Sequence, residues 1–179
     1  YRYNNGVPSN GSGCGNETAS EMPMFRKFMI DSTEFWASEY KLGGFRFDLM
    51  GIHDIETMNQ LSKNLHENVS EYVTVYGEPW AAGSTGIGSG DQASVNNASR
   101  FTGIGMFSDR FRESAKGNND GAGFGWVQGG GNASELARGL QGNILNTNNS
   151  IQQQVNYVTC HDNLALADKL RTCGIIEAD

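Results

Sequence analysis

Residues 43–54, with the sequence GGFRFDLMGIHD, place charged side chains where a short strand ends. Because side chains alternate along a strand, Arg46, Asp48 and Met50 share one face. An unpaired charge is costly to bury, so Arg46 and Asp48 are poor core residues. The arginine would keep the aspartate ionised, since a nearby opposite charge lowers the pKa of a carboxyl group. A fixed carboxylate at a strand end can act as a nucleophile or stabilise positive charge. A salt bridge that only caps the strand explains the same pattern.

Two further acids follow short apolar segments that are typical of strands. Glu78 follows residues 73–77, and Asp162 follows residues 155–159. In β/α barrels the carboxyl ends of the parallel strands carry the active site, whereas the opposite ends serve stability. Asp48 occupies the matching position at the end of the segment 45–49. Any one of these acids could be a helix N-cap or a loop salt bridge, but three in equivalent positions favour a site.

Two carboxyl groups can cleave a glycosidic bond when one is ionised and the other is protonated. Asp48, beside Arg46, suits the ionised member. Glu78 is flanked by aromatic residues and a proline, an apolar setting that would raise its pKa. Trp80 offers a flat ring that could stack on a sugar, although a core aromatic is an equally good interpretation.

Other chemistries have weaker support. The pairs His161-Asp162 and His53-Asp54 could each hold a divalent ion, but neither has the paired-histidine spacing of a zinc hydrolase. No phosphate-binding Gly-x-x-x-x-Gly-Lys-Ser/Thr loop is present. His66 is most simply a solvated residue of a helix.

The composition excludes several classes of partner. The chain has 179 residues, a net charge of −7 and a pI of about 4.9, without any cluster of Lys and Arg. We therefore expect no nucleic-acid or membrane partner. Three cysteines, Cys14, Cys160 and Cys173, predict free thiols or at most one disulfide bridge. Nothing in the sequence decides where in or outside the cell the protein is located.

The elements that must position these residues alternate between helix and strand. Helices are expected near residues 23–40, 54–66, 109–116, 133–140 and 164–171, and strands near 45–49, 73–77, 101–107 and 155–159. Asp54 is the expected N-cap of the second helix, whose buried stripe comprises Ile55, Met58, Leu61 and Leu65. The first helix carries one broad apolar face, which comprises Phe25, Phe28, Met29, Phe35, Trp36 and Tyr40.

This alternation implies parallel strands joined by helical crossovers, and so an α/β fold. A complete eight-stranded β/α barrel typically needs about 250 residues. Since the chain supplies about four strands, it predicts half of such a barrel or a small open α/β sheet.

Three motifs, in this order, resemble conserved regions of the alpha-amylase superfamily of glycoside hydrolases. They are GFRFDLMGIHD (44–54), YGEPW (76–80) and VNYVTCHDN (155–163). The segment SGCGNETASE (12–21), followed by the helix over 24–40, resembles more specifically type I pullulanase. The resemblance implies an α/β fold, a partial (β/α)8 TIM barrel with about strands four to seven and their helices. It also implies a retaining enzyme that cleaves α-1,6-glucosidic branch linkages in pullulan, amylopectin or limit dextrins.

Carried over by motif, the resemblance also implies roles for individual residues. Asp48 would be the nucleophile, Glu78 the general acid/base, and Asp162 the third acid, which stabilises the transition state. Arg46 would orient the nucleophile and keep it charged. The other residues implied to bind or shape the substrate are His161, Trp80, Met50 and Asn163.

One departure is the absence of the family's Asp-x-x-x-Asn-His region. We therefore expect residues 1–179 to be an internal, single-domain fragment of a catalytic barrel that is inactive and poorly stable alone, because strand edges and an apolar face would be uncovered. The resemblance implies an α-glucan partner and no required cofactor, with calcium allowed in a longer parent enzyme. Alternatives are an isoamylase-like or α-1,4-acting enzyme of the superfamily, or a non-catalytic glucan-binding half-barrel that uses Trp80, Phe124 and Trp126.

Overall fold

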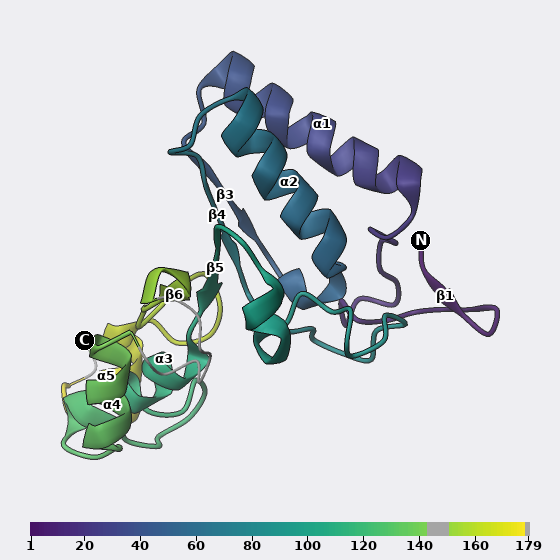
Figure 1. Ribbon diagram of the computed structural model, residues 1–179. Helices are drawn as coiled ribbons and strands as arrows, with labels where there is room; N and C mark the ends of the chain where they lie inside the picture. The colour runs from purple at the N-terminus through teal and green to yellow at the C-terminus, as the bar shows by residue number, and fades with distance from the viewer. Residues whose placement is uncertain (143–150, 178–179) are drawn as a thin grey trace. The chain divides into compact units, whose positions relative to one another are not determined.

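The computed structural model describes residues 1–142 and 151–177. The chain divides into two compact units, Tyr1–Met106 and Phe107–Asp179. Helices and strands alternate along most of the chain (Figure 1). In chain order the elements are β1 (Tyr3–Asn4), β2 (Val7–Pro8), α1 (Pro23–Tyr40), β3 (Gly44–Phe47), η1 (Met50–Ile52), α2 (Ile55–Asn68), β4 (Thr74–Gly77), η2 (Val95–Arg100), β5 (Ile104–Phe107), α3 (Asp109–Lys116), η3 (Trp126–Gln128), α4 (Ala133–Leu140), η4 (Ile151–Gln153), β6 (Gln154–Val155) and α5 (Leu166–Thr172).

Strands β3, β4 and β5 pair in parallel, as the alternation of elements predicts. β3 pairs in parallel with β4, and β4 pairs in parallel with β5. The strand order is β3-β4-β5-β6. In the second unit the backbone N–H of Ser108, directly after β5, donates to the carbonyl of Val155 in β6 at 3.1 Å. The predicted α/β class is therefore confirmed.

α2 forms as its sequence predicts. Asp54 is the N-cap and accepts a hydrogen bond from the backbone N–H of Thr57 at 2.9 Å. Such a cap satisfies an N–H group that has no partner within the helix. All four residues of the expected stripe are buried, namely Ile55, Met58, Leu61 and Leu65. This stripe supplies a large part of the core of the first unit.

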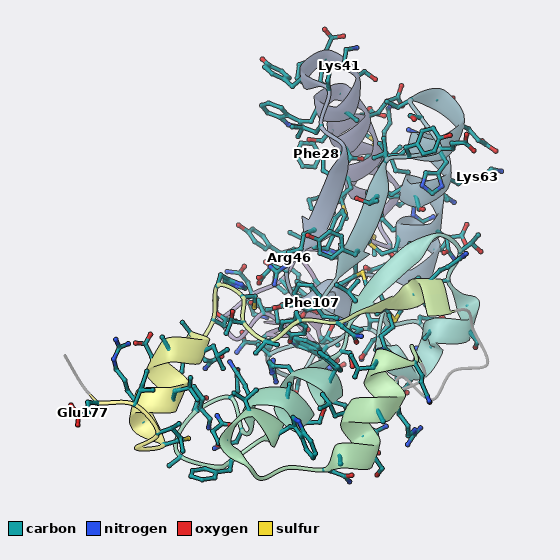
Figure 2. The ribbon with its side chains drawn as sticks, turned by 90° about the vertical axis from the view of Figure 1, so that its left-hand side faces the viewer. Phe28, Lys41, Arg46, Lys63, Phe107 and Glu177 are labelled. Atoms are coloured by element: carbon teal, nitrogen blue, oxygen red, sulfur yellow. The ribbon has the colours of Figure 1, made fainter. Side chains whose placement is uncertain are left out.

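α1 begins at Pro23 and lies beside α2 (Figure 1). Arg26 joins the two helices, because it donates to Thr57 Oγ1 at 2.7 Å and pairs with Asp54 Oδ2 at 3.1 Å. The aromatic face of α1 remains largely exposed, with 62% of Phe28 accessible to solvent (Figure 2). The buried residues of this helix are Met29 and Ala37.

One predicted strand differs from the observed structure. The expected strand over 155–159 is wrong, because β6 comprises only Gln154–Val155. After it, side-chain contacts hold the chain: Asn156 Nδ2 donates to the Gly139 carbonyl at 2.9 Å, and Tyr157 stacks on Phe107 with ring centroids 4.3 Å apart. The N-terminal segment contains the short β1–β2 hairpin.

Cys14, Cys160 and Cys173 are free, as expected. None of the helices in the described part of the chain has the length and apolar character needed to span a bilayer.

Candidate active site

Arg46 bridges two of the three predicted catalytic acids. One nitrogen of its guanidinium group, NH1, pairs with Asp48 Oδ1, and the other, NH2, pairs with Glu78 Oε1 at 2.6 Å. Arg46 belongs to β3, and its side chain projects near the carboxyl end of that strand (Figure 2). The expected contact with Asp48 is confirmed, and the contact with Glu78, 32 residues away, is an addition.

The parallel register explains why these acids meet. Phe47 is paired with Gly77, so Asp48 and Glu78 follow directly on neighbouring strands. The backbone N–H of Glu78 also donates to the Phe47 carbonyl at 3.0 Å. Gly77 allows this close approach, because a Cβ atom there would lie 2.6 Å from the Phe47 carbonyl oxygen.

The two carboxylates differ in exposure and in hydrogen bonding. The side chain of Asp48 is 56% exposed, whereas that of Glu78 is 4% exposed. Glu78 Oε2 accepts from the backbone N–H of Leu49 at 2.7 Å, and Oε1 accepts from Arg46. The apolar setting expected for Glu78 is therefore wrong, because the register brings a guanidinium group and a backbone donor to its two oxygens.

A tight turn after β3 orients the backbone N–H of Leu49 toward Glu78. Leu49 adopts a left-handed conformation with φ 44°, which is uncommon for a residue other than glycine. In η1, the backbone N–H of Gly51 donates to the carbonyls of Trp80 at 3.0 Å and Glu78 at 3.3 Å. A Cβ atom at Gly51 would lie 2.4 Å from the Trp80 carbonyl carbon. The turn and the Glu78–Trp80 segment are thus packed backbone against backbone.

Trp80 and Met50 take different positions around this turn. Trp80 is half-buried, so the residue keeps some contact with solvent. Met50 is completely buried. Met50 therefore packs inside the protein and offers no surface for direct contact with a substrate.

The remaining candidates belong to the second unit and lie together on one exposed segment. His161 Nε2 lies 3.4 Å from Asp162 Oδ1, with the two side chains 52% and 63% exposed. Asn163 has φ 61°, and its amide Nδ2 donates to Asp120 Oδ1 at 2.6 Å. Asn163 Oδ1 accepts from Asn119 Nδ2. The side-chain amide of Asn163 therefore contacts other residues of the protein. This differs from the substrate contact that the resemblance implies for Asn163.

Sequence reasoning missed a buried ionic cluster in the first unit. Arg2 NH1 pairs with Glu17 Oε1 at 2.5 Å, and these side chains are 4% and 0% exposed. Ser9 and Thr85 also donate to the same carboxylate oxygen, each at 2.7 Å. The cluster ties the N-terminal segment to the loop that follows Trp80. No local sequence signal marks it, because its members are up to 83 residues apart.

His53 and Asp54 are not arranged as a metal-binding pair. Asp54 Oδ1 accepts from Ser20 at 2.7 Å, and Oδ2 accepts from Thr57 and Arg26. Burial, together with the nearby positive charge of Arg2, lowers the pKa of His53 to about 4. His66 lies in α2, is half-buried, and its Nε2 lies 2.9 Å from the Val73 carbonyl oxygen.

Known proteins with similar sequences include several pullulanases. No model of a protein family matches the chain. The pullulanase of Bacillus subtilis (strain 168) is 37% identical over an alignment of 173 residues, which covers 92% of this chain and 24% of that protein. The chain therefore spans about a quarter of the length of this curated relative.

The structures of solved pullulanases superimpose on nearly the whole of this chain. The pullulanase from Anoxybacillus sp. LM18-11, complexed with maltotetraose, superimposes with a TM-score of 0.89 at 40% identity, covering 99% of this chain and 26% of that one. Type I pullulanase from Bacillus subtilis str. 168, complexed with maltose, gives a TM-score of 0.88 at 36% identity, covering 99% and 26%. These matches define the class of the chain as part of the catalytic barrel of a glycoside hydrolase. Within that class, the chain belongs to the pullulanase family.

Proposed function

We propose that this chain supplies the catalytic acids of a retaining enzyme that hydrolyses α-1,6-glucosidic branch linkages in pullulan, amylopectin or limit dextrins. The observation that carries the proposal is the Arg46 guanidinium, which contacts both Asp48 and Glu78 at neighbouring strand ends. Retaining glycosidases place their two carboxyl groups only about 5–5.5 Å apart. A single guanidinium group that bridges both acids favours this short spacing over the wider one of inverting enzymes.

The different surroundings of the acids support different roles. Asp48 is the more exposed carboxylate, so its oxygen can reach the anomeric carbon and form the glycosyl-enzyme intermediate. Arg46 keeps this nucleophile charged and fixes its orientation. Because the reaction uses two carboxyl groups and water, it requires no cofactor.

Glu78 acts as the general acid/base in this proposal. In the first step it gives its proton to the leaving oxygen, and in the second it takes a proton from the attacking water. Both of its oxygens now accept from N–H donors, Arg46 and Leu49. Each oxygen has a second lone pair, which can carry the proton that the acid step requires.

Asp162 is assigned as the third acid, which binds sugar hydroxyl groups and stabilises the transition state. Its exposed carboxylate and the adjacent His161 present charge and hydrogen-bonding groups on one segment. Trp80, which is half-buried, provides the ring for stacking on a sugar. The maltotetraose and maltose complexes of the related pullulanases support an α-glucan as the partner.

The proposal can be tested in a chimeric enzyme, in which this chain replaces the matching segment of the Bacillus subtilis pullulanase. We expect the chimera to release reducing sugar from pullulan by α-1,6 cleavage. Asp48→Asn should abolish turnover, because the amide cannot act as the nucleophile, and should leave the circular dichroism spectrum unchanged. The matched control is Asp31→Asn, whose exposed carboxylate pairs only with a surface lysine among the contacts described.

Three outcomes would overturn the proposal. Full turnover in the Asp48→Asn chimera would show that this carboxylate is not the nucleophile. Cleavage of α-1,4 linkages alone would indicate another enzyme of the superfamily. Glucan binding without any cleavage by the unmodified, folded chimera would favour the non-catalytic alternative.

A further inference from the structure

Two lysines in the second unit are buried without a carboxylate among their hydrogen-bond acceptors in the described residues. Lys116 and Lys169 are both 0% exposed. Lys116 Nζ donates to the carbonyl of Leu164 at 2.9 Å. Lys169 Nζ donates to three oxygens: Asn118 O at 2.9 Å, Asn118 Oδ1 at 2.8 Å and Gly121 O at 2.6 Å. Burying an ammonium group is costly unless its donors are satisfied, so this arrangement fixes the backbone groups that accept from it.

Asn163 connects the loop held by Lys169 to the segment that contains Asp162. Its side-chain amide donates to Asp120 Oδ1 at 2.6 Å and accepts from Asn119. Its backbone adopts φ 61°, a left-handed conformation that asparagine tolerates better than most residues. The loop over 118–121 therefore holds the residue that directly follows Asp162.

The side chain of Asp162 depends on this backbone for its orientation. It is 63% exposed, so surrounding packing does not immobilise it. Asn163 is held through Asp120, and Leu164 is held through Lys116. The two residues after Asp162 are thus tied to two separate elements, the 118–121 loop and the end of α3.

We propose that Asp120, together with Lys116 and Lys169, positions Asp162 for the reaction. The inference rests on the proposed function, in which Asp162 stabilises the transition state. It also assigns Asn163 as a positioning residue that acts through the backbone. A displacement of about 1 Å at a reacting group can cost about 100-fold in rate. Loss of the contacts that position Asp162 should therefore lower kcat more than it changes KM.

The test compares two substitutions of Asp120 in the chimeric enzyme. Asp120→Ala removes the acceptor for the Asn163 amide, whereas Asp120→Asn retains a carbonyl oxygen at the same place. We expect Asp120→Ala to lower kcat on pullulan at least about 10-fold with less than about a 3-fold change in KM. Asp120→Asn should recover most of this loss. The control is Asp168→Ala, which removes an exposed carboxylate that pairs with Arg171 at 3.3 Å and should leave kcat unchanged.

Hydrogen exchange provides a readout that does not depend on activity. Backbone amides of residues 161–165 should exchange faster in the Asp120→Ala chimera than in the control, while amides of α2 remain unchanged. Equal kcat in Asp120→Ala and Asp168→Ala, or equal loss in Asp120→Ala and Asp120→Asn, would overturn the inference. If the unmodified chimera lacked α-1,6 activity, the proposed function would fail, and the exchange rates alone would decide whether Asp120 holds the segment.

Discussion

The buried pair of Arg2 and Glu17 gives a quantitative prediction for the first unit. Burial alone would raise the pKa of Glu17, but hydrogen bonds from Ser9, Arg2, Thr85 and the backbone of Gly86 outweigh it and lower the pKa from 4.5 to about 2. One pKa unit corresponds to about 1.36 kcal/mol. The charged form of Glu17 should therefore stabilise the folded chain by about 3 kcal/mol at neutral pH.

The dependence on pH follows from the direction of this change. Because the pKa of Glu17 is lower in the folded than in the unfolded chain, the stabilisation is complete above about pH 4.5. It is lost as the pH falls through about 2, when the folded carboxylate is protonated as well. Glu17→Gln should thus lower the free energy of unfolding by about 3 kcal/mol at pH 7, and the difference from the wild type should shrink by about half near pH 3.

Urea titration of the chimeric enzyme, followed by circular dichroism, measures this difference. The control is Glu67→Gln, since Glu67 is 63% exposed and lies 3.8 Å from Lys63. An exposed pair of this kind is worth about 0–1 kcal/mol. A loss below about 1 kcal/mol in Glu17→Gln, or a loss that stays constant between pH 7 and pH 3, would refute the reasoning.

Two further predictions concern the turn that carries the site. Gly51→Ala should reduce turnover in the chimera at least about 10-fold, because its Cβ would lie 2.4 Å from the backbone of Trp80 and displace the turn; unchanged kcat would contradict the packing described. His53 should titrate near pH 4 in proton NMR spectra, because burial and then Arg2 disfavour the charged ring. Its neutral form contributes stability above about pH 6.5 that is lost as the pH falls through about 4, and titration near 6.5 would show that the ring is accessible to water.

Local sequence patterns predicted those elements that depend mainly on contacts between residues close together in the sequence. The boundaries of α2, its Asp54 cap and its buried stripe follow from helical periodicity and capping chemistry alone. The placement of Asp48 and Glu78 at neighbouring strand ends follows from the alternation of strands and helices. These features need no knowledge of the distant parts of the chain.

Features that depend on long-range contacts could not be predicted in this way. The reach of Arg46 to Glu78 depends on the register of two strands, and the burial of Arg2 depends on segments that meet only after folding. The exposure of the α1 aromatic face depends on what else packs against the helix, which periodicity does not report. β6 ends at Val155, and the stacking of Tyr157 on Phe107 that follows joins residues far apart in the sequence, which local periodicity does not report.

The central claim is that Asp48 is the nucleophile, and trapping the covalent intermediate tests it most directly. The chimera carrying Glu78→Ala, which slows hydrolysis of the intermediate, would be treated with a fluorinated α-glucosyl fluoride and digested for mass spectrometry. We predict a glycosyl adduct on the peptide that contains Asp48, and no adduct after Asp48→Asn. An adduct on another carboxylate, or none while the unmodified chimera cleaves pullulan, would contradict the assignment.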